Sequence, residues 1–123
     1  MQYFFLKMLR FPTKKLNVLA VRSGEKTLEL RLNKSPENRV LEGEQVILQS
    51  MTHACSVEIL HIFKYISVDE VLRNHDFTMF VPGCSSADEA KELASTYMDM
   101  NYQEGYLVWE IKYLNDCRPV WQR

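Results

Sequence analysis

A strict alternation of leucines and polar residues from position 27 to 33 (TLELRLN) constrains the fold more than any other feature. Leu28, Leu30 and Leu32 share one face of an extended segment, and the intervening polar side chains share the other face. The pattern therefore predicts a half-buried strand with one dry face and one polar face.

The remaining patterns predict a strand, a helix, three strands, two helices and a final strand. Because strands and helices do not alternate regularly, a doubly wound parallel sheet is excluded. We therefore expect an α+β fold in which a small mixed sheet curls into a β-barrel with flanking helices. The strands are expected at 2–9, 27–33, 44–50, 54–65 and 106–114.

Each helix has recognisable boundary signals. Pro12 suits the first turn of a helix that runs to about residue 22, and Gly24 suits its left-handed cap. Ser67 and Ser86 are each followed three residues later by glutamate, which is the capping-box pattern. Helical spacing predicts that the first helix buries Leu16, Leu19 and Ala20 and that the last one buries Ala90, Leu93, Ala94 and Tyr97.

Length and composition indicate one domain over residues 1–123. The chain is 46% hydrophobic, so it can build a core without disulfides, and its three cysteines cannot form a complete disulfide framework. No apolar run approaches the ~20 residues of a membrane span. Lys7 and Arg10 interrupt the apolar start, so we expect no signal peptide and a cytoplasmic domain without a membrane partner.

The net charge of −1 hides an asymmetry. Residues 1–40 hold nine lysines and arginines against three glutamates, whereas the rest of the chain is acidic. One explanation is a face that accepts phosphates or other anions. The other is charge distributed over the surface for solubility.

Lys26, Glu29 and Arg31 form the most informative constellation. Glu29 and Arg31 lie two residues apart on the polar face of the strand, and Lys26 lies at its mouth. Arginine offers a planar fork to phosphate or to a base edge, lysine offers a point charge, and glutamate accepts from an amino group. A set of solvated cross-strand ion pairs is the alternative interpretation.

The run G-x-K-T-x-E-x-R-L over residues 24–32 resembles the hallmark of the activating signal cointegrator homology (ASCH) family. Further segments resemble that family in the same order: EGEQVIL, IFKYISVDEVL, FVPGCSSADEA and YMDMNYQEGYLVWEIKYL. The resemblance implies a PUA-like fold that binds RNA or a nucleotide, without a cofactor. Lys26, Glu29 and Arg31 would line the cleft, and Gly24 would let the helix end close to the ligand.

An enzymatic branch of that family, the small amidohydrolases of acetylcytidine, pairs the motif lysine with a threonine three residues later. Here Lys26 matches, but Glu29 stands at the threonine position. The alternative function is therefore a hydrolase of modified nucleosides or RNA, with Lys26 as acid/base and Glu29 activating water. A protein-interaction domain that keeps the fold without the ligand is a third possibility.

Other residues carry weaker signals. Ser85 and Ser86 precede a helix, where backbone N–H groups favour anions, although a plain cap explains them equally well. Tyr65 and Tyr106 are our candidates for base stacking in the cleft. The remaining cysteines and histidines lack the spacing of a metal site, so no metal is expected. A Cys84–His75 pair is an alternative nucleophile, and Trp109 is expected in the core.

Overall fold

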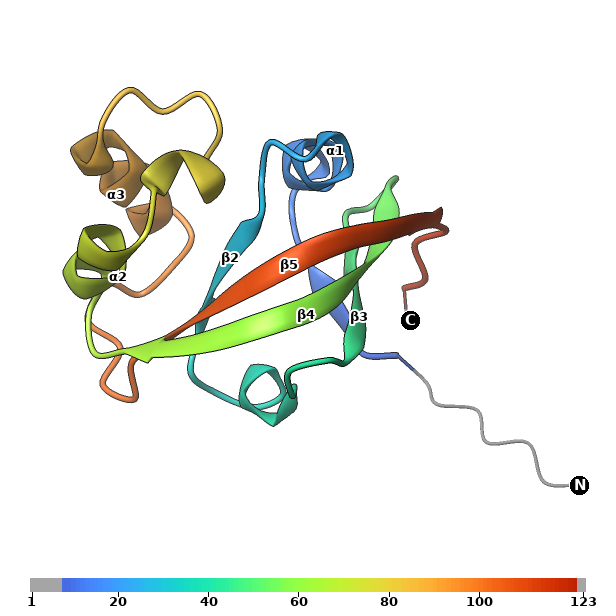
Figure 1. The fold of residues 1–123 in the computed structure, drawn as a ribbon, viewed down its shortest axis with the longest axis horizontal. Helices are drawn as coiled ribbons and strands as arrows, with labels where there is room; N and C mark the ends of the chain where they lie inside the picture. The colour runs from blue at the N-terminus through green and yellow to red at the C-terminus, as the bar shows by residue number, and fades with distance from the viewer. Residues whose placement is uncertain (1–7, 122–123) are drawn as a thin grey trace, which may run out of the picture.

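The computed structural model describes residues 8–121 and contains a five-stranded mixed sheet with three α-helices (Figure 1). Two short 3-10 helices, η1 and η2, lie in the connections. In chain order the elements are β1 (Arg10–Pro12), α1 (Lys15–Ser23), β2 (Leu28–Leu32), η1 (Glu37–Arg39), β3 (Gln45–Gln49), β4 (Ala54–Tyr65), α2 (Val68–Asn74), η2 (Phe77–Met79), α3 (Ala87–Ser95) and β5 (Tyr106–Cys117). No helix of the described residues is long and apolar enough to cross a membrane.

The strand order in the sheet is β1-β3-β4-β5-β2. β1 pairs with β3 in parallel, and every other neighbouring pair is antiparallel. β4 and β5 form a long ribbon that crosses the whole molecule in Figure 1 and contains two register shifts. Such shifts bend and twist a ribbon, which lets this sheet curve. β1 and β2 remain its two edges, so the expected barrel closure is not confirmed.

β5 supplies side chains to two hydrophobic clusters because successive residues of a strand point to opposite faces. Leu107, Trp109 and Ile111 pack into the larger cluster, together with Val18 and Val21 of α1. The second cluster joins the other face of β5 to the helices of the β4–β5 connection. Its buried members are Leu28, Val68, Val71, Phe80, Tyr106 and Val108.

The helices are arranged as two groups (Figure 1). α2, η2 and α3 stand together at one end of the β4–β5 ribbon, and α1 lies apart from them. Ser67 and Ser86 begin α2 and α3 as predicted, since each side chain accepts a hydrogen bond from the amide of the glutamate three residues later. Gly24 ends α1 in the left-handed conformation, also as predicted.

Several boundaries differ from the expectation. The strand predicted at 2–9 falls mostly outside the described residues, and the observed first strand is β1. Pro12 ends β1 instead of starting the helix. α1 buries Val18 and Val21, whereas Leu16 is exposed, because a helix of nine residues presents only one narrow stripe to the sheet. On α3, Ala90 and Ala94 are buried and Leu93 is exposed, and Tyr97, which follows the end of the helix, is exposed as well.

The turn before β5 gives a test of this packing. Gly105 has φ +86°, and a Cβ at this position would collide with the backbone carbonyl oxygen of Tyr65. We expect Gly105→Ala to lower the free energy of unfolding by about 3 kcal/mol, since left-handed strain and a clash with rigid backbone both act. Chemical denaturation with a two-state fit measures this change.

Gly43→Ala is the matched control. Gly43 has a similar φ of +89°, but a Cβ there meets open space. This substitution should cost only the backbone strain, about 1 kcal/mol. Equal losses for the two variants would contradict the close approach of the β5 turn to the end of β4.

Candidate nucleotide pocket

Lys26 and Glu29 form a buried ion pair at the start of β2. The Lys26 ammonium lies 3.3 Å from Glu29 Oε1, and the two side chains are only 4% and 7% exposed. The same ammonium donates to the carbonyl oxygens of Leu28 at 2.8 Å and of Phe80 at 2.6 Å. Its three N–H groups therefore have three acceptors, and one of them belongs to the connection that follows η2.

Arg31 extends the ion pair into a chain of charges. Its Nη2 donates to Glu29 Oε2 and to the carbonyl oxygen of Pro12, both at 3.2 Å. The guanidinium carbon lies 5.5 Å from the ring centroid of Phe11 and 5.7 Å from that of Trp109, within cation–π range. Arg31 thus links β2 with β1, which are the two edges of the sheet.

The two neighbouring cations favour the ionised form of the Glu29 carboxyl group. Burial alone would raise its pKa, but the Lys26 ammonium and the Arg31 guanidinium outweigh burial and hold the pKa below its usual value. Glu29 and Arg31 therefore share one face of β2, as predicted. This face is not exposed to solvent, however, because Arg31 packs against the aromatic rings of the core.

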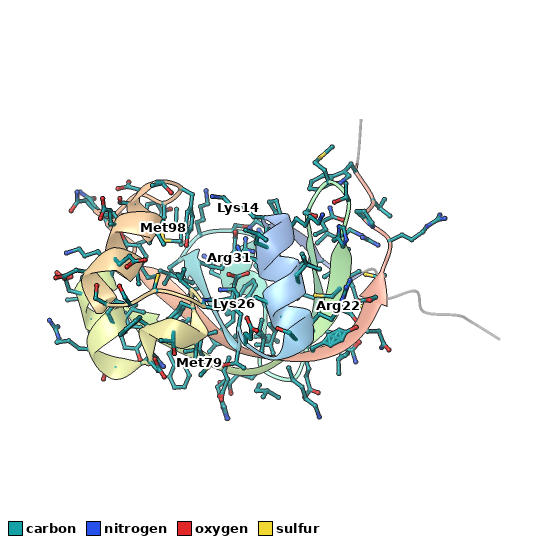
Figure 2. All side chains as sticks on the ribbon, turned by 90° about the horizontal axis from the view of Figure 1, so that it is seen from above. Lys14, Arg22, Lys26, Arg31, Met79 and Met98 are labelled. Carbon is teal, nitrogen blue, oxygen red and sulfur yellow. The ribbon has the colours of Figure 1, made fainter. Side chains whose placement is uncertain are left out.

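A pocket of about 450 Å³ opens beside this chain of charges. Figure 2 shows Lys26 and Arg31 between α1 and the helices of the β4–β5 connection, with Lys14 and Met98 near the same opening. The pocket volume lies in the range usual for small-molecule sites. Its lining residues are Pro12, Thr13, Lys14, Asn17, Glu29, Leu30, Arg31, Leu32, Lys34, Glu37, Tyr97 and Met98.

The structure brings together Lys26, Glu29 and Arg31 as the sequence predicted, but only Glu29 and Arg31 line this pocket. Lys26 lies behind them, next to a much smaller cavity of about 20 Å³, and it also lines a separate surface hollow of about 440 Å³ on the other side. Gly24 lies at the far end of α1, beside the same surface hollow. The idea that Gly24 brings the helix end to the ligand therefore does not fit this pocket.

The predicted stacking tyrosines lie elsewhere. Tyr106 is 1% exposed, and its hydroxyl donates to the Asp99 carbonyl oxygen at 2.6 Å, so it is a core residue. The Tyr65 hydroxyl lies 2.7 Å from His75 Nε2, and neither residue lines the pocket. Burial also lowers the pKa of His75.

The side chains of Ser85 and Ser86 form hydrogen bonds with Glu89 at the start of α3. Ser85 Oγ donates to Glu89 Oε2 at 2.6 Å, and Ser86 Oγ accepts from the Glu89 amide at 3.1 Å. The Glu89 carboxylate therefore occupies the place proposed for an anion. Burial raises the pKa of the nearby Cys84 thiol, which disfavours a thiolate nucleophile. The described residues contain no cluster of three metal-ligating side chains, and Trp109 is fully buried as expected.

Among the pocket residues that were not predicted from the sequence, four are charged or aromatic: Lys14, Lys34, Glu37 and Tyr97. Lys14 and Lys34 belong to the basic first third of the chain, which was the available signal. Tyr97 was assigned to the core by helical spacing, but α3 ends at Ser95, and Tyr97 is 56% exposed. Nothing in the spacing of residues 26–37 indicates that Glu37 folds back toward Arg31.

Two solved structures share this fold. Hypothetical protein PH0355 superimposes with a TM-score of 0.79 and 19% sequence identity, over 88% of this chain and 100% of that chain. Protein PF0455 from Pyrococcus furiosus, determined by solution NMR, superimposes with a TM-score of 0.68 and 18% identity, over 88% and 98%. At these identities the comparison shows the fold alone. No protein-family model matches the chain, and no curated protein matches it by sequence.

The buried charges give a stability prediction. Glu29→Gln leaves the Lys26 and Arg31 cations buried without their shared carboxylate, so we expect a loss of about 3 kcal/mol in the free energy of unfolding at neutral pH. Glu25→Gln is the control, because Glu25 is exposed in the same segment and forms no ion pair with a described residue. A loss as small as that of the control would contradict the role of Glu29.

We also expect the stability difference between the wild type and Glu29→Gln to depend on pH. Because the folded-state pKa of Glu29 is lowered, its contribution is present above the usual value of about 4.5 and is lost as the pH falls toward the folded-state pKa. The stability difference between the wild type and Glu29→Gln should therefore shrink below about pH 4.5. Urea titrations across this range measure it, and a constant difference would refute the assignment.

Proposed function

We propose that this chain is a PUA-like domain of the ASCH type that binds RNA or a nucleotide in the pocket between α1 and the end of α3. The observation that carries the proposal is the distribution of charge around the pocket. The floor is close to neutral, since the negative charges of Glu29 and Glu37 balance the positive charges of Lys26 and Arg31.

The rim of the pocket is positive. Lys14 and Lys34 line it, both are exposed, and neither forms an ion pair with any residue in the described range. α1 begins at Lys15 beside the same opening, so the positive end of its dipole faces the rim. A neutral polar floor below a cationic rim suits a ligand with a polar head and an anionic group, which is the chemistry of a nucleotide.

Binding is favoured over hydrolysis by the position of Lys26. A general acid or base must reach the substrate within hydrogen-bond distance, directly or through one water. Lys26 is 4% exposed, its ammonium is held by Leu28, Phe80 and Glu29, and it does not line the pocket beside Arg31. Glu29 is likewise engaged by two cations. The pair is therefore suited to positioning Arg31.

The barrel belongs to the same proposal. The edges of the sheet, β1 and β2, have no backbone ladder between them, but the Arg31 side chain reaches across to the Pro12 carbonyl oxygen. We propose that this contact closes the sheet in the manner of a PUA-like barrel, with the pocket at the closure. The resemblance of residues 24–32 to the ASCH motif supports this assignment.

The rim lysines provide the direct test, because their replacement leaves the buried charges intact. Fluorescence anisotropy with a short single-stranded RNA, at salt concentrations between about 50 and 200 mM, measures the affinity and its salt dependence. We expect Lys14→Ala/Lys34→Ala to weaken binding and to reduce the slope of log K against log salt by about 1.4, since each phosphate contact on a single strand contributes about 0.7.

Lys15→Ala/Arg39→Ala is the matched control. These residues are exposed close to the same segments, carry the same total charge and do not line the pocket. The control should bind nearly as the wild type does. Equal losses for the two double variants would mean that only net charge matters, and the absence of any wild-type binding would refute the proposed function.

A further inference from the structure

The free edge of β2 presents one backbone donor and one backbone acceptor to the pocket. The Ile111 amide donates to the Thr27 carbonyl oxygen, and the Asn33 amide donates to that of Gly105, so the odd-numbered residues of this strand face β5. Hydrogen-bonding direction alternates along an antiparallel strand. The N–H and C=O of Leu30 therefore point away from β5, and Leu30 lines the pocket.

Leu30 is the residue of this edge whose carbonyl oxygen is not already bonded. The Leu28 carbonyl oxygen accepts from Lys26 Nζ at 2.8 Å, and the Leu32 carbonyl oxygen accepts from the Lys34 amide at 2.9 Å. A peptide strand that extended the sheet would need several consecutive free groups. A single adjacent donor and acceptor instead fits one small planar group.

The pocket floor next to Leu30 offers further polar groups. Arg31 Nη1 donates to no described residue, and the nearest oxygen of Glu37 is 3.9 Å away, too far for a hydrogen bond. Glu37 lines the pocket, and neither of its carboxylate oxygens has a hydrogen-bond partner among the described residues. Buried polar groups without partners are costly, so a ligand that supplies them is favoured.

One wall of the pocket is an exposed aromatic ring. Tyr97 lines the pocket from the segment after α3, and its hydroxyl bonds to no described residue. Lys14 Nζ lies 5.5 Å from the centroid of its ring, at the mouth of the pocket. A flat heterocycle stacks on such a ring, and the Lys14 ammonium then lies close to the groups that follow the heterocycle out of the pocket.

We propose that the pocket holds one unpaired nucleobase of a nucleotide. Its hydrogen-bonding edge meets the Leu30 backbone and Glu37, its face stacks on Tyr97, and its phosphate lies at Lys14 and Lys34. This inference rests on the proposed function and adds to it the part of the ligand that is recognised. The Watson–Crick edge of every base places an acceptor next to a donor, and pairing in a duplex consumes both. The pocket therefore accepts single nucleotides and unpaired residues and rejects base pairs.

Calorimetric titrations with the four nucleoside monophosphates and with ribose 5-phosphate test this inference. We expect at least one monophosphate to bind about tenfold or more tightly than ribose 5-phosphate, as a stacked base provides. Tyr97→Leu should abolish that difference, because it removes the ring on which the base stacks. Tyr97→Phe, the matched control, should keep the difference because it retains the ring. An RNA duplex without unpaired bases should compete poorly.

The outcomes separate the two proposals. Equal affinity for ribose 5-phosphate and all monophosphates, or equal competition by duplex and single strand, would overturn base recognition and leave the anion-binding proposal in place. Retention of the tenfold preference in Tyr97→Leu would overturn the stacking role. Failure of all these phosphates and of RNA to bind would overturn both proposals.

Discussion

Burial of the Glu29 carboxylate between two cations is the interaction on which the rest of the structure depends. The Lys26 ammonium donates a hydrogen bond to the Phe80 carbonyl oxygen and so attaches the helical connection between β4 and β5 to the start of β2. The Arg31 guanidinium donates a hydrogen bond to the Pro12 carbonyl oxygen and so attaches β1 to β2. Glu29 pairs with both cations and Glu37 balances the second positive charge, which matters because a buried charge without a partner is strongly destabilising. One carboxylate therefore determines how three parts of the chain meet.

This arrangement also decides the character of the pocket. Because the charges in the floor compensate one another, the floor offers hydrogen bonds more than net charge, and the unbalanced charge lies at the rim on Lys14 and Lys34. In the sequence, the ASCH-like motif gave the impression that the same residues form the site and attract the ligand. In the structure, these two tasks belong to different residues. The motif residues build the floor, whereas residues outside the motif, among them Tyr97, line the wall and the rim.

The structure brings together the predicted site residues that share one strand and separates those that lie on distant segments. Alternation along a strand places Glu29 and Arg31 on one face whatever the rest of the chain does. Tyr106 has the same alternation on β5, but the face to which it points is covered by the helical connection, so its ring is in the core. Ser85 and Ser86 already have a partner, because Glu89 in the first turn of α3 forms hydrogen bonds with both.

The sequence by itself determined the strands, the helix caps and the grouping of Lys26, Glu29 and Arg31, because these follow from contacts between residues within four positions of one another. Only the tertiary structure decided that this group is buried, that Phe80 and Pro12 supply its carbonyl oxygens, and that Tyr97, Glu37 and Lys14 surround one pocket. Those contacts join residues far apart in the chain. They depend on how the sheet curves and on where the two groups of helices pack, and no local pattern encodes either.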